Sequence, residues 1–182
     1  HSARMSAMQA FGQPVHTRYN FLNANVVVSL DSDFLASGVG YLRYAREFSA
    51  RRRVRTDQTT MNRLYVVEPM PSATGTKADH RLPLRAGEVE EFARALAAGV
   101  GAASGPQPGE NGDIYKWIGP ISRDLLANKG ASLVIAGECQ PPIVHTLAHA
   151  MNAALGNVGK TVIYSDPVEA NPVDQVASLQ DL

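Results

Sequence analysis

The stretch ANVVVSLDSDFL, residues 24–35, decides the fold class of this chain. Its apolar run is short, rich in valine and followed by a polar turn, which is typical of a strand buried on both faces of a sheet. Comparable runs lie at 64–67, 133–136 and 162–164, and the first three of the four runs each precede a polar turn and a helical stretch. This alternation predicts an α/β fold: a doubly wound, mostly parallel sheet of about five strands with helices on both faces.

The spacing of apolar residues predicts the other elements. A short strand is expected over 78–84, where leucines alternate with polar residues. Helices are expected where apolar residues recur at three- and four-residue spacing, namely over 40–52, 88–98, 114–128 with an interruption near Gly119 and Pro120, and 141–155. Glycine and proline dominate 99–112, which predicts a surface loop.

The length of the chain fits one domain. Its 182 residues, 45% of them hydrophobic, are enough for a single hydrophobic core. We expect an irregular leading loop over 1–23, the α/β domain over 24–165, and a linker over 166–182 that ends in the start of a helix. That last segment predicts that the chain is a piece of a longer protein.

The charge, hydropathy and cysteine content of the chain exclude several classes of partner and of site. The 17 basic and 17 acidic residues give a net charge of zero, so no overall field favours nucleic acid or an anionic membrane. No apolar run approaches the roughly 18 residues of a membrane-spanning helix, so direct membrane insertion is not expected. The single cysteine, Cys139, excludes an internal disulfide and a Cys-x-x-Cys metal site.

One stretch is strongly basic: only Asp57 opposes its five arginines, Arg51, Arg52, Arg53, Arg55 and Arg63. The simpler interpretation is a solvated helix end, because cations near a helix C-terminus are favoured by the helix dipole. Contact with an acidic partner is the alternative.

The candidate site lies where the strands end, because ligands of parallel sheets bind at the carboxyl ends of the strands. Asp31, Ser32 and Asp33 follow the first strand, Glu68 ends the second, and Thr74 lies in the next turn. Carboxylates at this edge repel a phosphate, so the crevice is poorly equipped for a nucleotide. Asp33 is alternatively a turn or cap residue that binds nearby backbone N–H groups.

A polar stripe runs along the helix expected over 141–155. His145, His149 and Asn152 share one helical face, and the opposite face supplies apolar core residues. A zinc pair is one interpretation, but the sequence offers no clear third ligand. We expect the stripe to meet another domain or solvent.

Three stretches carry a resemblance to a known family: residues 24–35, residues 61–68 with 78–84, and the GNVGK of residues 156–160. They resemble the molybdopterin oxidoreductase superfamily, and more narrowly its cofactor-less branch, the large iron–sulfur subunit of alternative complex III. The resemblance implies a Rossmann-like fold, as in the cofactor-binding domains of formate dehydrogenase and dimethyl sulfoxide reductase.

The chain departs from the catalytic members of that superfamily. In those members the first turn presents Gly, Ser and Asn to the pterin guanine dinucleotide, and the second strand ends in Asp-Pro-Arg. Here the corresponding residues are Asp31-Ser32-Asp33 and Glu68-Pro69-Met70. Glu68 keeps an acceptor for a guanine edge, but the arginine is missing. The resemblance therefore implies a vestigial cofactor crevice.

The leading hypothesis is a non-catalytic scaffold and interaction domain, without its own cofactor. By resemblance, its parent is an iron–sulfur subunit on the periplasmic face of the bacterial inner membrane, in a quinol-oxidising respiratory complex. Its partners are then the other domains of that subunit and the other subunits, and the iron–sulfur clusters lie elsewhere in the parent. Two alternatives remain open: a molybdopterin guanine dinucleotide-binding domain of an active oxidoreductase, and an independent nucleotide or small-molecule binding module.

Overall fold

A parallel sheet of four strands forms the centre of the structure, a computed structural model that describes residues 2–104, 113–167 and 175–182. The strands are β2 (Val26–Leu30), β3 (Arg63–Glu68), β4 (His80–Pro83) and β5 (Ser132–Ala136), in the order β4-β3-β2-β5. All three pairings are parallel, and Val28 of β2 lies opposite Tyr65 and Val134. Every residue of β2 and β5 is buried, as the continuous apolar runs predict.

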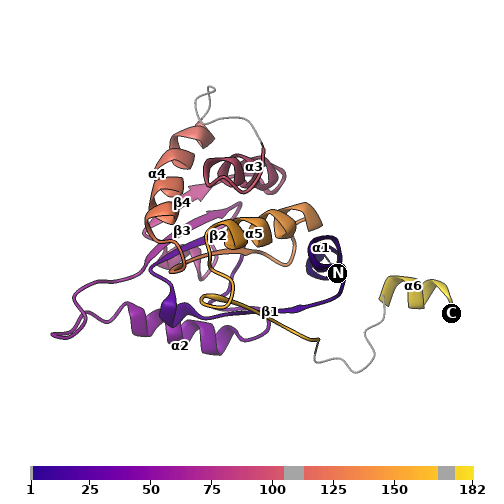
Figure 1. Ribbon diagram of the computed structural model, residues 1–182, viewed down its shortest axis with the longest axis horizontal. Coiled ribbons are helices and arrows are strands. Elements are labelled where there is room, and N and C mark those ends of the chain that lie inside the picture. Colours follow the sequence, from indigo (N-terminus) through magenta and orange to yellow (C-terminus); the bar gives the residue numbers. More distant parts are fainter. Residues whose placement is uncertain (1, 105–112, 168–174) are drawn as a thin grey trace.

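Helices cover both faces of this sheet (Figure 1). One face packs against α2 (Tyr41–Arg51), where Val27 and Leu133 meet Phe48. The other face packs against α3 (Val89–Gly99), α4 (Asp113–Ala127) and α5 (Pro142–Ala154), where Val28 and Leu30 join the larger core cluster. Each fully buried side chain of this kind contributes about 1.5–3 kcal/mol through the hydrophobic effect.

The four predicted helices are confirmed, with one correction. The interruption expected near Gly119 and Pro120 is wrong, because α4 continues through Pro120. Proline removes one backbone hydrogen bond inside a helix, but most of the stability of a helix in a protein comes from packing of its apolar face. Ile118, Ile121 and Leu125 are all buried on either side of the proline.

The prediction of an irregular segment over 1–23 is wrong. This segment forms α1 (Ser2–Phe11), strand β1 (His16–Tyr19) and the 3₁₀ turn η1 (Phe21–Asn23). Helix α1 packs against α5 (Figure 1), and β1 pairs antiparallel with β6 (Val162–Ser165). The apolar signal is weak because only Ser6 and Ala7 of α1 are buried, so packing against distant elements decides the structure here.

Strand β6 exists, but its expected place in the parallel sheet is wrong. The side chain of Asn152 occupies the outer edge of β5: its Oδ1 accepts a hydrogen bond from Val134 N at 3.0 Å, and its Nδ2 donates to Val134 O at 2.7 Å. A further strand would need those same backbone groups. The described sheet therefore ends at β5 with four strands rather than about five.

The remaining described elements are two 3₁₀ turns, η2 (Gly75–Lys77) and η3 (Ala86–Glu88), and the short helix α6 (Gln175–Gln180). The loop predicted over 99–112 and the linker predicted over 166–182 are described only in part, because 105–112 and 168–174 lie outside the described residues. Within the described ranges, no helix combines the length and apolar character needed to cross a bilayer.

Candidate functional site

The structure brings the five predicted site residues to the carboxyl edge of the sheet. Asp31 directly follows β2, Glu68 is the last residue of β3, and Ser32, Asp33 and Thr74 lie in the loops beyond. Asp31 adopts a left-handed backbone conformation, with φ of 58°. An aspartate tolerates this conformation better than most residues because its short polar side chain binds groups nearby.

The gap between β2 and β5 is bridged by the chain itself. Gln140 Nε2 donates to Asp31 Oδ2 at 2.8 Å, and Gln140 is 2% exposed. The turn after β5 passes so close that a Cβ on Gly137 would overlap the carbonyl oxygen of Asp31. A Cβ on Gly38 would lie only 3.0 Å from Glu138 Oε1. The crevice where a parallel sheet of this order binds ligands is therefore crossed by direct contacts between its two loops.

The gap on the other side of β2 is bridged by Asp33. Its Oδ1 accepts hydrogen bonds from Thr74 N and Thr74 Oγ1, both at 2.8 Å. Thr74 Oγ1 in turn accepts from Leu35 N at 3.1 Å. These bonds join the loop after β2 to the loop after β3. Asp33 thus has a structural role, as the alternative interpretation expected, but the one backbone N–H that its side chain binds belongs to Thr74 in another loop and not to its own turn.

Ser32 is held within its own loop. Its backbone N–H donates to Ser29 Oγ at 3.0 Å, and Ser29 Oγ donates to Ser32 O at 2.8 Å. This reciprocal pair fixes the first turn after β2.

Glu68 is a buried carboxylate, 2% exposed, and its partners come from the same chain. Arg81 Nε donates to Oε1 at 2.6 Å, Ser72 Oγ donates to Oε2 at 2.6 Å, and Ser72 N donates to Oε1 at 3.3 Å. Gly75 closes over the carboxylate so tightly that a Cβ there would overlap Glu68 Oε1. This charge is paired and hydrogen-bonded, as a buried charge needs to be.

No protein-family model and no curated protein matches this chain. The pterin guanine dinucleotide, which the catalytic members of the resembled superfamily bind, must therefore be judged on the residues alone. They do not suit it: Asp31, Asp33 and Glu68 already bind groups of the chain, and two of them bridge the loops between which the cofactor's phosphates would lie. An iron–sulfur cluster is bound by several cysteines, whereas the whole chain has one, the exposed Cys139.

The expectation that the histidine stripe faces another domain or solvent is wrong. His145 and Asn152 are buried, and the ring of His149 packs against Phe11 of α1 and Tyr164 of β6. His149 Nδ1 lies 2.9 Å from the Tyr164 hydroxyl. The described residues contain no group of three His, Cys, Asp or Glu side chains that could bind a metal ion. The predicted apolar face of the same helix is confirmed as core.

Burial controls the protonation of this stripe. It lowers the pKa of His149 to about 4, with a smaller contribution from neighbouring His145, and it raises the pKa of Tyr164 to about 12. Burial also lowers the pKa of His145. Both rings are therefore neutral at pH 7, which suits their place between packed elements rather than a catalytic role.

The sequence did not predict Gln140 and Arg81, the residues that donate hydrogen bonds to the carboxylates of Asp31 and Glu68. Gln140 lies far from Asp31 in the sequence, and no local pattern connects the two residues. Arg81 had a weak signal, because alternation along β4 places it on the face opposite Leu82, where Glu68 also lies. The sequence showed where the carboxylates lie, and the structure shows what they bind.

Proposed function

We propose that this chain is a non-catalytic scaffold and interaction domain with a doubly wound, Rossmann-like fold. The strand order supports the fold: it runs from β2 through β3 to β4 on one side and places β5 on the other, which is the order of the first four strands of a dinucleotide-binding domain. The observation that carries the function is the bridging of both gaps beside β2 by Asp31 and Asp33.

The energetics favour the scaffold over a nucleotide site. A dinucleotide that entered beside β2 would displace hydrogen bonds to carboxylates, each worth about 1.5–3 kcal/mol. It would also place phosphate charge near Asp31 and Asp33, at a cost of about 4 kcal/mol for unit charges 4 Å apart at intermediate dielectric. In a scaffold, the same bonds stabilise the domain.

By resemblance, we propose that the parent is a molybdopterin-oxidoreductase-like iron–sulfur subunit of a quinol-oxidising respiratory complex. The domain then belongs to the periplasmic face of the inner membrane, with other domains and subunits of the complex as its partners. Other parts of that subunit would hold the clusters, since this chain has only one cysteine.

Calorimetric titration with GDP and Mg²⁺ tests the scaffold against both binding alternatives. We expect no heat of binding up to millimolar nucleotide. A dissociation constant near micromolar would refute the scaffold and favour a working dinucleotide half-site or a nucleotide-binding module. An Asp33→Asn variant removes the charge of this residue but keeps its shape: binding by the variant alone would assign the exclusion of nucleotide to repulsion by Asp33, and continued failure to bind would show that blockage by the loops is sufficient.

The parent complex needs a separate test. An antibody against this chain should precipitate, from detergent-solubilised native membranes, an assembly with iron–sulfur signals in electron paramagnetic resonance and quinol-oxidising activity. Precipitation of the polypeptide without clusters would refute the proposed parent and leave the GDP result standing.

A further inference from the structure

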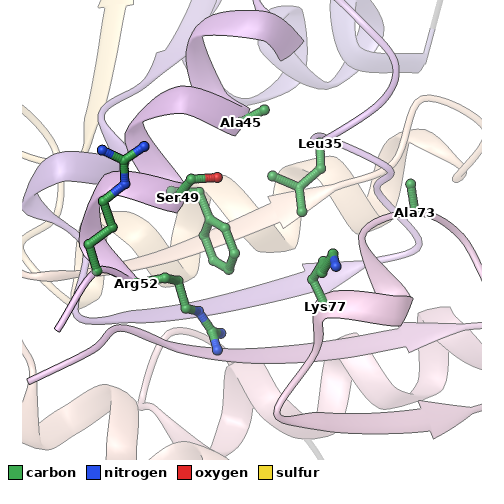
Figure 2. A pocket seen from close by; sticks show the side chains of 8 residues that line it. Leu35, Ala45, Ser49, Arg52, Ala73 and Lys77 are labelled. Atoms are coloured by element: carbon green, nitrogen blue, oxygen red, sulfur yellow. The ribbon is translucent and has the colours of Figure 1, made fainter.

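A groove lies between α2 and the connection from β3 to β4, with a volume of about 460 Å³. In Figure 2, Ala45 and Ser49 of α2 form one side together with Arg52, which directly follows the helix, and Leu35, Ala73 and Lys77 form the other. Phe48 and Arg53 complete the lining. None of the five predicted carboxyl-edge residues lines this groove, so it is a separate feature of the domain.

The lining combines an apolar floor with positive charge. Arg52 is internally neutralised: its two terminal nitrogens donate to the carboxylate of Asp79 at 2.8 and 2.6 Å, and its guanidinium carbon lies 4.8 Å from the centre of the Phe48 ring. Arg53 and Lys77, by contrast, have no ion-pair partner within the described ranges. Two cationic groups therefore border an apolar surface without compensation.

The lowered pKa of Asp79 is consistent with a stable ion pair between Arg52 and Asp79. Burial raises this pKa, but hydrogen bonds from Arg52 and from Leu64 N outweigh burial and hold it below its ordinary value. Arg52 is thus committed to Asp79 and stabilises the wall of the groove, while Arg53 and Lys77 are available to a ligand.

The same face of α2 extends the groove along the helix. Leu42, Ala45 and Ser49 are separated by three and four residues, so they lie in one stripe of α2, and Leu42 is 72% exposed. At 1.5 Å per residue, the stripe from Leu42 to Ser49 is about 10 Å long. The cationic Arg53 lies just beyond the C-terminal end of the helix. A surface that continues from the groove along an exposed helix face suits a peptide better than a compact small molecule.

We propose that this groove binds an acidic peptide segment of a partner protein. The segment places an apolar side chain against the half-buried Leu35 and Ala45, and two carboxylates against Arg53 and Lys77. Arginine binds carboxylates through paired, charge-assisted hydrogen bonds, and an apolar anchor in a pocket supplies much of the affinity of a small interface. The inference deepens the proposed scaffold function, on which it rests, by naming the surface and the chemistry of the partner.

Fluorescence anisotropy with a labelled peptide of repeated Glu-Leu-Asp triplets tests this proposal. Two matched probes serve as controls: Lys-Leu-Lys triplets reverse the charge, and Glu-Ser-Asp triplets remove the apolar anchor. We expect the first peptide to bind at least about tenfold more tightly than either control, and to bind more weakly as salt screens the charges. Amide chemical shifts in a nuclear magnetic resonance titration should change at Ser49, Arg53 and Lys77.

Variants locate the binding. Combined Arg53→Glu and Lys77→Glu should weaken the acidic peptide by about tenfold or more. Each groove substitution made alone should also weaken the peptide, whereas Arg123→Glu, a matched single charge reversal on α4 across the sheet, should leave its affinity within about twofold. Ser49→Trp, which fills the groove without changing charge, should abolish binding and keeps the test valid if the charge reversal unfolds the domain.

Equal binding of the three peptides would overturn the proposal, as would equal weakening by the groove and α4 variants. Binding of benzoate as tight as that of the peptide would assign the groove to a small organic anion instead. None of these results depends on GDP, so the inference and the scaffold function fail separately.

Discussion

Removal of the Asn152 side chain should destabilise the domain, because this side chain binds the backbone at the outer edge of β5, where the sheet ends. The Asn152→Ala variant leaves the N–H and C=O of Val134 without their partners, and both residues are almost fully buried. A buried backbone group without a partner costs about 1–3 kcal/mol, so two such groups cost about 2–6 kcal/mol. We expect the free energy of unfolding to fall by about 4 kcal/mol, a large part of the 5–15 kcal/mol typical of a domain.

Urea unfolding measures this loss. With a dependence of about 2 kcal/mol per molar urea, the midpoint should fall by about 2 M. The control is Asn23→Ala, which removes an exposed asparagine whose 3.3 Å bond to Lys160 O reaches solvent, and which should cost less than about 0.5 kcal/mol. A loss of under about 1 kcal/mol for Asn152→Ala, or a loss equal to that of the control, would refute the reasoning.

The Asn152→Asp variant sharpens this test. It keeps the shape of the side chain but replaces the donor to Val134 O with an oxygen that carries a proton only in acid. Burial raises the pKa of such a carboxyl above its unfolded value, so the deficit should be largest at neutral pH and shrink as the pH falls. The comparison is the difference from the wild-type domain at each pH. A deficit that stays constant with pH would contradict the role of the Nδ2 donor.

Two further predictions concern packing and pH. Gly75→Ala should destabilise the domain by about 1–3 kcal/mol, because the added Cβ overlaps Glu68 Oε1. Gly119→Ala, where the added Cβ meets open space within α4, should stabilise the domain by about 0.5–1 kcal/mol. Equal urea midpoints for the two variants would contradict this prediction. Unfolded His149 binds a proton near pH 6.5 and the folded residue near pH 4, so stability should fall as the pH drops through that window, by at most about 3 kcal/mol. In His149→Phe, the free energy of unfolding measured with urea should depend less on pH between 6.5 and 4. An unchanged dependence on pH would refute the assignment of this effect to His149.

Patterns along the chain predict the elements whose structure is decided by their own apolar residues. The valine-rich run at Val26–Leu30 and the helical spacing in α3 each identify an element directly, because a continuous run suits a strand buried on both faces and alternating three- and four-residue spacing suits a helix. Helix α1 and strand β1 lack such patterns. They form because α5 and β6, far away in the sequence, provide surfaces for them.

In the candidate site, too, the sequence predicts the positions of some residues but not their partners. The end of each buried strand predicts where Asp31 and Glu68 lie, since parallel strands end at a common edge. Their hydrogen-bond partners depend on how closely loops approach one another, and that distance is set by packing of the whole domain. Gly137 and Gly75 permit these approaches, but glycine is common in turns for its backbone freedom alone, so the close contacts at these two positions become visible only in three dimensions.

The antiparallel pairing of β1 with β6 has a consequence for biosynthesis. The ribosome makes α1 and β1 well before α5 and β6, the helix and the strand that receive them. Until α5 and β6 have emerged from the exit tunnel, Phe11 lacks the rings of His149 and Tyr164, against which it packs. The nascent chain must therefore keep α1 and β1 without their packing partners until β6 is made, which makes this segment a natural target for chaperones.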